Sequence, residues 1–135
     1  MQVSVYHLQL NVRDADIALP FYRALLTYLD YRVTYERPGV LGMSNSTTDF
    51  WLIATPPDRR RHAPHRKNPG LNHVALRVTS RADVDRFHDE FLKPRGIAAL
   101  YSGPREYPEY RPGYYAVFFE DPDRLKLEVV HIPCA

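Results

Sequence analysis

The chain has 135 residues, a hydrophobic fraction of 44% and a net charge of +2. This composition predicts a single compact domain with a sizeable core and excludes a disordered protein. A charge so close to zero gives no support for nucleic-acid binding. Because Cys134 is the only cysteine, an internal disulfide and a cysteine-based zinc site are also excluded.

The first residues alternate as a strand does and lack the basic stretch and apolar core of a signal peptide. No apolar run approaches the length of a membrane span. We therefore expect a cytoplasmic protein whose partners include neither a membrane nor nucleic acid.

The first predicted strand covers residues 3–12. Its apolar positions share one face, which should pack on a helix: Tyr6, Leu8, Leu10 and Val12. The opposite face carries His7, Gln9 and Asn11, and we expect it to look into polar surroundings.

A helix is predicted over residues 17–29, with Asp16 as its N-cap and an apolar stripe along one side. Strands near 31–36, 39–44 and 48–55 should complete the first half. Residues 57–70 combine prolines with many basic side chains, and this composition predicts an exposed linker.

The second half begins with a predicted strand over residues 71–79, which carries His73. Ser80 should cap a helix over 81–93, with Asp83 at the third position as in a capping box, and Gly96 should end it. Further strands are predicted at three places: 97–102, 113–120 and 125–131.

The two halves repeat each other. His7 and His73 are 66 residues apart, and the same offset aligns apolar positions in the strand and in the helix that follows. A constant offset through two kinds of element indicates two copies of one supersecondary unit. We expect modules over about 1–56 and 71–132, within one domain that spans 1–135.

Three potential metal ligands stand at related places in these modules. His7 and His73 open the first strand of each half, and Glu128 lies in the last strand. Two imidazoles and a carboxylate can hold a divalent metal and leave positions open, and they suit Fe, Mn, Ni, Co or Zn without selecting among them. Alternatively, Glu128 pairs with Arg77 or Lys126, because a buried carboxylate needs a cation nearby.

These motifs resemble the vicinal oxygen chelate superfamily, which includes glyoxalase I, fosfomycin- and bleomycin-resistance proteins and extradiol dioxygenases. The resemblance rests on the His7 strand, on residues 70–75 and above all on residues 118–128, which read FFEDPDRLKLE. It covers residues 3–132. It implies an α+β fold, with two βαβββ modules that form a cupped mixed sheet, and it implies a homodimer.

The resemblance also implies where metal ligands lie, and His7, His73 and Glu128 fall on three of the four positions. The fourth position falls at or beside Trp51, whose indole cannot bind a metal. This departure argues against glyoxalase I and leaves a site of two histidines and one carboxylate, as in the fosfomycin-resistance enzymes and the extradiol dioxygenases. Arg124 also replaces the glycine that usually follows the Asp-Pro-Asp sequence.

Several polar and aromatic side chains are candidates for binding a small-molecule substrate: Gln9, Asn11, Trp51, Arg77, Tyr101 and Tyr110. Arg77 can hold a carboxylate or phosphate, or it can form a structural ion pair. The aromatic stretch around 104–112 is predicted to be a loop that covers the site, or one that packs on the surface or at a dimer contact. The catalytic candidates are Glu128 and Tyr115, with the tyrosine as an acid.

Two functions remain open at this stage. The first is a metal-dependent lyase, isomerase or dioxygenase that binds a small oxygenated substrate through two of its oxygens. The second is a metal-free protein that binds a small molecule, as the bleomycin-resistance proteins do. The set of three ligands favours the enzyme, whereas Trp51 and the aromatic loop fit the binding protein.

Overall fold

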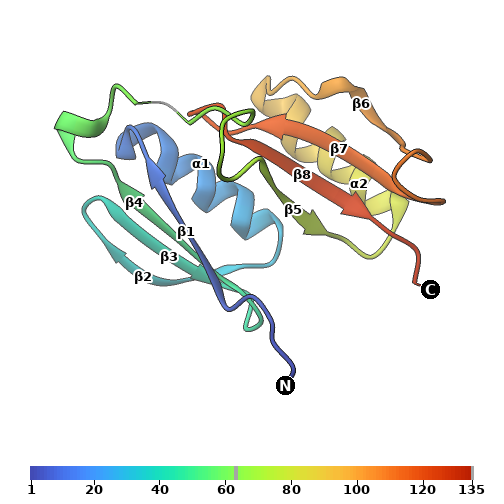
Figure 1. Ribbon diagram of the computed structural model, residues 1–135, viewed down its shortest axis with the longest axis horizontal. Helices are drawn as coiled ribbons and strands as arrows, with labels where there is room; N and C mark the ends of the chain where they lie inside the picture. Colours follow the sequence, from blue (N-terminus) through green and yellow to red (C-terminus); the bar gives the residue numbers. More distant parts are fainter. Residues whose placement is uncertain (63, 135) are drawn as a thin grey trace. The chain divides into compact units, whose positions relative to one another are not determined.

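The computed structural model describes residues 1–62 and 64–134, and within them the chain forms eight strands and two α-helices (Figure 1). The contacts divide the chain into two compact units, residues 1–63 and 64–135. Each unit has the element order βαβββ, so the predicted α+β fold with two such modules is confirmed. The boundary between the units lies in the predicted linker.

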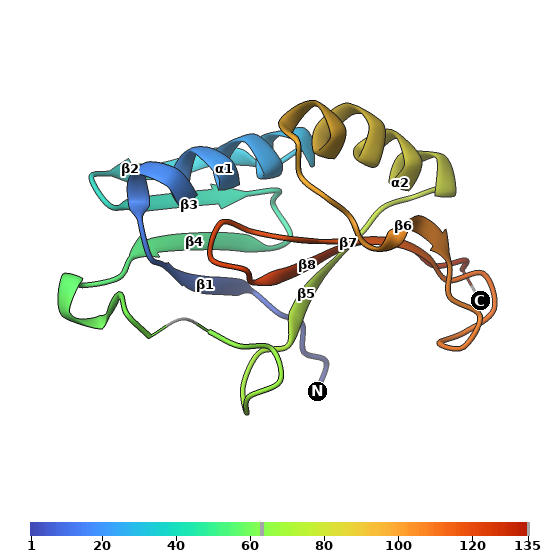
Figure 2. The ribbon, with the colours of Figure 1, turned by 90° about the horizontal axis from the view of Figure 1, so that it is seen from above.

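Unit 1 contains β1 (His7–Val12), α1 (Ala15–Tyr28), β2 (Arg32–Arg37), β3 (Val40–Ser44) and β4 (Asp49–Ala54). The strands form one sheet in the order β1-β4-β3-β2, in which β1 runs parallel to β4 and the other neighbours are antiparallel. Helix α1 covers one face of this sheet (Figure 2).

The helix of unit 1 begins two residues earlier than predicted. Asp14, not Asp16, is the N-cap, because its carboxylate accepts a 2.9 Å hydrogen bond from the Asp16 amide. The apolar stripe of α1 packs on the apolar sides of β3 and β4, and the buried residues include Leu26, Met43 and Leu52. This face of the sheet is therefore closed by the helix, and its other face is the one that carries His7.

Unit 2 repeats the arrangement with β5 (His73–Arg77), α2 (Arg81–Phe87), β6 (Leu100–Glu106), β7 (Tyr115–Glu120) and β8 (Lys126–His131). The sheet order is β5-β8-β7-β6, again with the first pair parallel. In the described part of the chain, no helix is both long and apolar enough to span a membrane.

The helix α2 begins at the predicted capping residue, and its helical turns end at the predicted glycine. The Ser80 hydroxyl accepts a hydrogen bond from the Asp83 amide at 3.1 Å, and it donates one to the Asp83 carboxylate at 2.8 Å. The helical turns continue through residues 88–95 and stop at Gly96, whose φ of 65° lies in the left-handed region that glycine adopts easily.

Strand β6 extends further than predicted, to Glu106, so part of the expected loop at 104–112 is strand. A register shift between Leu100 and Arg105 accommodates Gly103, which has a φ of 88°. Glycine and proline usually interrupt a strand. Gly103 and Pro104 are accommodated here by a bulge in β6, which lies at the edge of the sheet.

Candidate functional site

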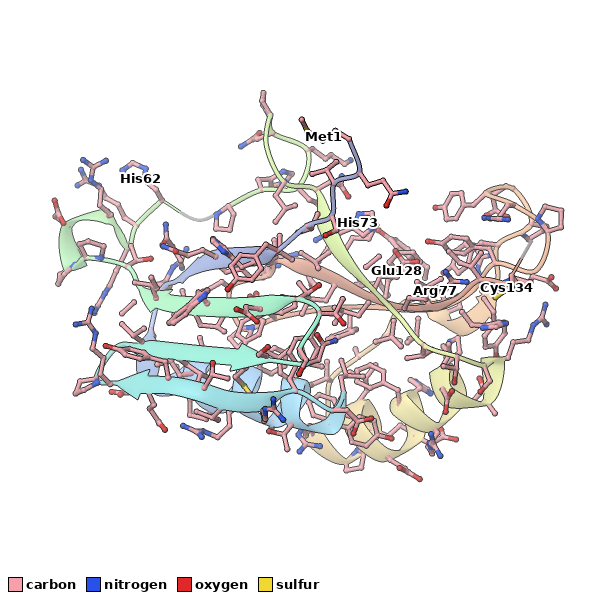
Figure 3. The ribbon with its side chains drawn as sticks, turned by 90° about the horizontal axis from the view of Figure 1, so that it is seen from below. Met1, His62, His73, Arg77, Glu128 and Cys134 are labelled. Carbon is pink, nitrogen blue, oxygen red and sulfur yellow. The ribbon has the colours of Figure 1, made fainter. Side chains whose placement is uncertain are left out.

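The sheet of unit 2 has one face packed on α2, and we call the opposite face its open face. Phe119 packs on Phe87 of α2, with ring centroids 5.3 Å apart. Since neighbouring strand residues alternate between faces, Phe118 and its pairing partner Glu128 lie on the open face. His73 on β5 lies there too, and Figure 3 shows it beside Glu128.

Glu128 is the central group of this face. It lies on a strand between two neighbours, and its exposed fraction is 0%. One carboxylate oxygen, Oε2, lies 3.0 Å from Nε2 of His73. The other, Oε1, accepts a hydrogen bond from the hydroxyl of Tyr114. Both oxygens thus have a polar partner, as a buried carboxylate requires.

Asn72 decides which nitrogen of His73 carries a proton. The Asn72 amide nitrogen donates to the Arg66 carbonyl at 3.0 Å, so the Asn72 oxygen faces His73 Nδ1, 2.7 Å away. Nδ1 must then be the donor, and Nε2 of a neutral imidazole presents a lone pair to Glu128. A doubly protonated imidazole would instead donate from Nε2 to the carboxylate as an ion pair, so the contact suits either a proton or a cation between the two atoms.

The alternative cation partners of Glu128 do not contact it. Arg77 donates to the backbone carbonyl of Ile132 at 2.9 Å. The ammonium of Lys126 lies over the ring of Phe118, 4.6 Å from its centroid. The expectation that Arg77 or Lys126 pairs with Glu128 was therefore wrong, because His73 and Tyr114 occupy its two oxygens.

The structure also corrects the choice of tyrosine. Tyr115 pairs with His131 and lies on the helix side of the sheet, where its hydroxyl donates to Asp85 of α2 at 2.6 Å. It cannot act on a substrate at Glu128 from that side. Its neighbour Tyr114 is the tyrosine that meets Glu128, and burial together with this hydrogen bond raises the pKa of Tyr114, so its hydroxyl stays protonated and donates.

The raised pKa of Tyr115 predicts that the stability of the protein depends on pH. Burial, and then the hydrogen bond to Asp85, raise the pKa of Tyr115 to about 12, above the value of about 10 for an unfolded tyrosine. The stabilisation is therefore complete below pH 10 and is lost as the pH rises toward 12. Chemical denaturation across this range should show the stability advantage of the wild type over Tyr115→Phe shrinking. The exposed Tyr6→Phe is the control, and its profile should run parallel to the wild type; a parallel profile for Tyr115→Phe would contradict the assignment.

Five aromatic rings surround Glu128 on the open face, and we call them the aromatic cluster: Tyr101, Tyr107, Tyr110, Tyr114 and Phe118. Tyr110 stacks on Tyr107 with a centroid distance of 5.4 Å and an angle of 3°, and it meets Tyr114 edge-on at 5.3 Å. Phe118 contacts Tyr101 at 5.5 Å and Tyr107 at 5.4 Å. Tyr107 and Phe118 are each 2% exposed, whereas Tyr101 and Tyr110 are exposed, so the cluster joins the buried carboxylate region to the surface of the unit.

The open face of unit 1 carries the remaining candidates. His7 lies at the start of β1, with the exposed side chains of Gln9 and Asn11 behind it on the same face. Trp51 on β4 pairs with Gln9, and its ring lies flat against Gly42, where an added Cβ would come within 2.8 Å of it. The indole needs this glycine, because any side chain there would displace it.

The strand registers show what Trp51 replaces. Gln9 pairs with Trp51 in unit 1, and Ala75, which is 66 residues after Gln9, pairs with Glu128 in unit 2. Trp51 therefore occupies the position in the first module that Glu128 occupies in the second. The family resemblance, which put the fourth ligand position at or beside Trp51, agrees with this register.

Within the described residues, no three His, Cys, Asp or Glu side chains form a group that could hold a metal. His73 and Glu128 nevertheless suit a divalent cation. Their facing atoms, an imidazole nitrogen and a carboxylate oxygen 3.0 Å apart, are donors of the kind that would hold such a metal. Nδ1 of His73 is also held by an amide oxygen, as metal-binding histidines usually are. His7 belongs to the other unit, so its convergence with this pair stays a prediction.

Paired βαβββ modules, with a histidine opening each and a carboxylate on the last strand, define a protein of the vicinal oxygen chelate type. Residues 4–129 match the model of the Glyoxalase/Bleomycin resistance protein/Dioxygenase superfamily. The uncharacterized protein YqjT of Bacillus subtilis (strain 168) is 32% identical over 132 residues, which cover 96% of this chain and 100% of that protein. The chain belongs to this superfamily.

Solved structures agree with this assignment. A presumed glyoxalase from Bacillus halodurans is 31% identical, with a TM-score of 0.84 and a coverage of 97% of both chains. The lactoylglutathione lyase of Agrobacterium tumefaciens is 19% identical, with a TM-score of 0.70 over 96% of this chain and 94% of that one. The second similarity establishes a shared fold and nothing more.

Proposed function

We propose that this protein is a metal-dependent enzyme that acts on a small oxygenated substrate, as a lyase, an isomerase or a dioxygenase. The observation that carries the proposal is the contact between Nε2 of His73 and the buried Oε2 of Glu128, 3.0 Å apart, with Nδ1 of His73 facing the Asn72 oxygen. His73, Glu128 and His7 would hold the metal. Bound there, a divalent cation would polarise a carbonyl or bind two neighbouring oxygens of the substrate.

The chain's own residues prepare this chemistry in three ways. Tyr114 holds Oε1 of Glu128 by a hydrogen bond and so orients the carboxylate. Asn72 keeps the lone pair of His73 directed at the site. The aromatic cluster packs beside both groups, where it can exclude water and take the apolar part of a substrate.

A metal-free binding protein is the second candidate, and Trp51 favours it. An indole in the place of the fourth ligand, resting on Gly42 and 5.6 Å from the ring of Tyr35, gives unit 1 an aromatic surface of its own. Such surfaces bind flat molecules without a metal. The two candidates differ in one property that can be measured directly, the affinity for divalent metal.

Metal binding is the decisive test. After removal of metal with EDTA, adding Mn²⁺, Ni²⁺, Co²⁺, Fe²⁺ or Zn²⁺ at about 100 times its Kd should stabilise the protein by about 2.7 kcal/mol, a rise in Tm of roughly 9 °C. His73→Ala should lose this rise. His62→Ala removes an exposed histidine from the linker region and should keep it.

If none of these metals raises the Tm of the wild type, the enzyme proposal fails and the binding protein becomes the better description. If His73→Ala keeps the full effect, the metal binds elsewhere and the proposed site is wrong.

We further propose that the protein acts in the cytoplasm as a homodimer, as the family resemblance implies. Light scattering coupled to size-exclusion chromatography should give twice the 15.7 kDa mass of the chain; a monomer at micromolar concentration would contradict the dimer.

A further inference from the structure

Lys126 is a cation on the open face of unit 2 that the proposed metal site does not use. It opens β8, two residues before Glu128 on the same face, and it pairs directly with His73 across the parallel strands. Side chains at paired positions of neighbouring strands lie about 5 Å apart at Cβ. Lys126 is thus an immediate neighbour of both proposed ligands.

Glu120 is the carboxylate expected to form an ion pair with Lys126, but it binds other cations instead. Glu120 pairs with Lys126 on the antiparallel side, but its Oε2 accepts from Arg66 at 2.9 Å and from Arg124 at 3.3 Å. Although burial would raise the pKa of Glu120, the hydrogen bond from Arg66 and the charge and hydrogen bond of Arg124 hold it below its ordinary value. Two arginines therefore bind the carboxylate that lies across from Lys126.

The backbone of Arg124 is in an unfavourable conformation. Its φ is 65°, in the left-handed region that costs a residue other than glycine roughly 1–2 kcal/mol. The family resemblance places a glycine there, which would relieve the strain. The arginine instead supplies the second cation on Glu120, and among residues 1–62 and 64–134 no carboxylate forms an ion pair with Lys126.

The aromatic cluster holds the Lys126 ammonium in place. Nζ lies 4.6 Å from the ring centroid of Phe118 and 4.9 Å from that of Tyr101. The ring of His73 also meets Phe118, with centroids 5.9 Å apart. Phe118, whose exposed fraction is 2%, is therefore a buried neighbour that the imidazole and the ammonium share, and it holds the two groups close together. Ring faces fix a cation without neutralising it, so its charge stays available to a ligand.

We propose that Lys126 binds an anionic group, a carboxylate or a phosphate, on the substrate held at His73 and Glu128. This inference rests on the proposed function for the identity of that site, and it narrows the substrate to a small oxygenated anion. The ammonium would hold the anionic end of the substrate, on the side toward residues 120–124.

Anion binding by the metal-free protein tests this inference separately from metal binding. Titration calorimetry with malonate and with inorganic phosphate should give saturable binding that weakens with added NaCl, whereas neutral malonamide should not bind. Lys126→Met keeps the aliphatic stem over the rings and removes the charge, and it should weaken binding of the better anion at least about 10-fold. Lys126→Arg should restore binding to within about threefold.

Lys67→Met is the matched control, because it removes one exposed lysine from the same unit. If the wild type binds neither anion at 10 mM (a concentration chosen as about ten times a millimolar Kd), or if Lys126→Met binds as well as the wild type, the anion site is overturned. Metal affinity should stay within about threefold in Lys126→Met. Loss of anion binding with metal binding intact in Lys126→Met therefore identifies Lys126 alone. A wild type that binds the anion but none of the divalent metals would remove the proposed function while the anion site stands.

Discussion

Glu128→Gln is expected to lower the affinity for divalent metal by more than about 100-fold and to leave the metal-free protein folded. The amide has the shape of the carboxylate and can satisfy the same neighbours: its oxygen accepts from Tyr114, and its nitrogen donates to Nε2 of His73. What it lacks is the negative charge that binds a cation. Loss of a group that only supports a ligand already costs 10–100-fold, so loss of the ligand itself should cost more.

Glu128→Ala separates this chemical effect from a structural one. It leaves the Tyr114 hydroxyl without its acceptor and opens a cavity at a position with 0% exposure. We expect a loss of about 3–5 kcal/mol in the free energy of unfolding, measured by urea denaturation, against about 1 kcal/mol or less for the glutamine variant. Glu106→Gln, at a half-exposed ion pair with Arg81, is the control and should change neither quantity.

Metal affinity unchanged in Glu128→Gln would show that Glu128 is not a ligand. Equal stability of the alanine and glutamine variants would show that its buried hydrogen bonds do not matter to the fold.

Asn72→Leu is expected to lower metal affinity by about 10–100-fold, although Asn72 would not touch the metal. Its amide oxygen is the acceptor that holds the proton on Nδ1 of His73. Without that acceptor the proton can move to Nε2, where it donates to Glu128 and blocks the lone pair. Asn72→Asp offers an oxygen to the same nitrogen and should retain most of the affinity.

The ¹⁵N shifts of His73 in the metal-free protein give a readout that a general loss of packing would not produce. The wild type and Asn72→Asp should show a protonated Nδ1, and Asn72→Leu should show a mixture of tautomers or protonation on Nε2. If Asn72→Leu keeps the wild-type tautomer and the wild-type metal affinity, the amide has no role in orienting the imidazole.

Much of this molecule could be predicted from strand alternation and the repeat. The offset of 66 residues predicts two modules of one kind, and the structure shows two βαβββ units with matching sheet orders. Alternation puts His73 on the open face, and the hairpin that pairs Glu120 with Lys126 puts Glu128 there as well. The same parity assigns Tyr114 to that face and Tyr115 to the other, so this signal was present in the sequence and the prediction of Tyr115 missed it.

Other features carry no signal of this kind. Asn72 precedes β5, so alternation does not apply to it, and its contact with His73 depends on the linker carbonyl of Arg66. The choice of partner for Glu128 was also outside the pattern, because Lys126 and His73 both lie next to it on the open face. The structure pairs Glu128 with His73 and Tyr114, and it pairs Glu120 with Arg66 from the linker and Arg124 from a turn.

The amino-acid sequence alone determined the family, the two modules, the open-face positions of His73 and Glu128, and the tryptophan at the fourth position. These follow from periodicity and from short-range pairing, which depend on residues near one another in the chain or on a fixed offset. Only the tertiary structure decided which side chains satisfy the buried carboxylate, which nitrogen of His73 is free, and which cation is left for a ligand. Those outcomes depend on contacts between segments up to 55 residues apart, where several chemically suitable partners compete for the same atoms.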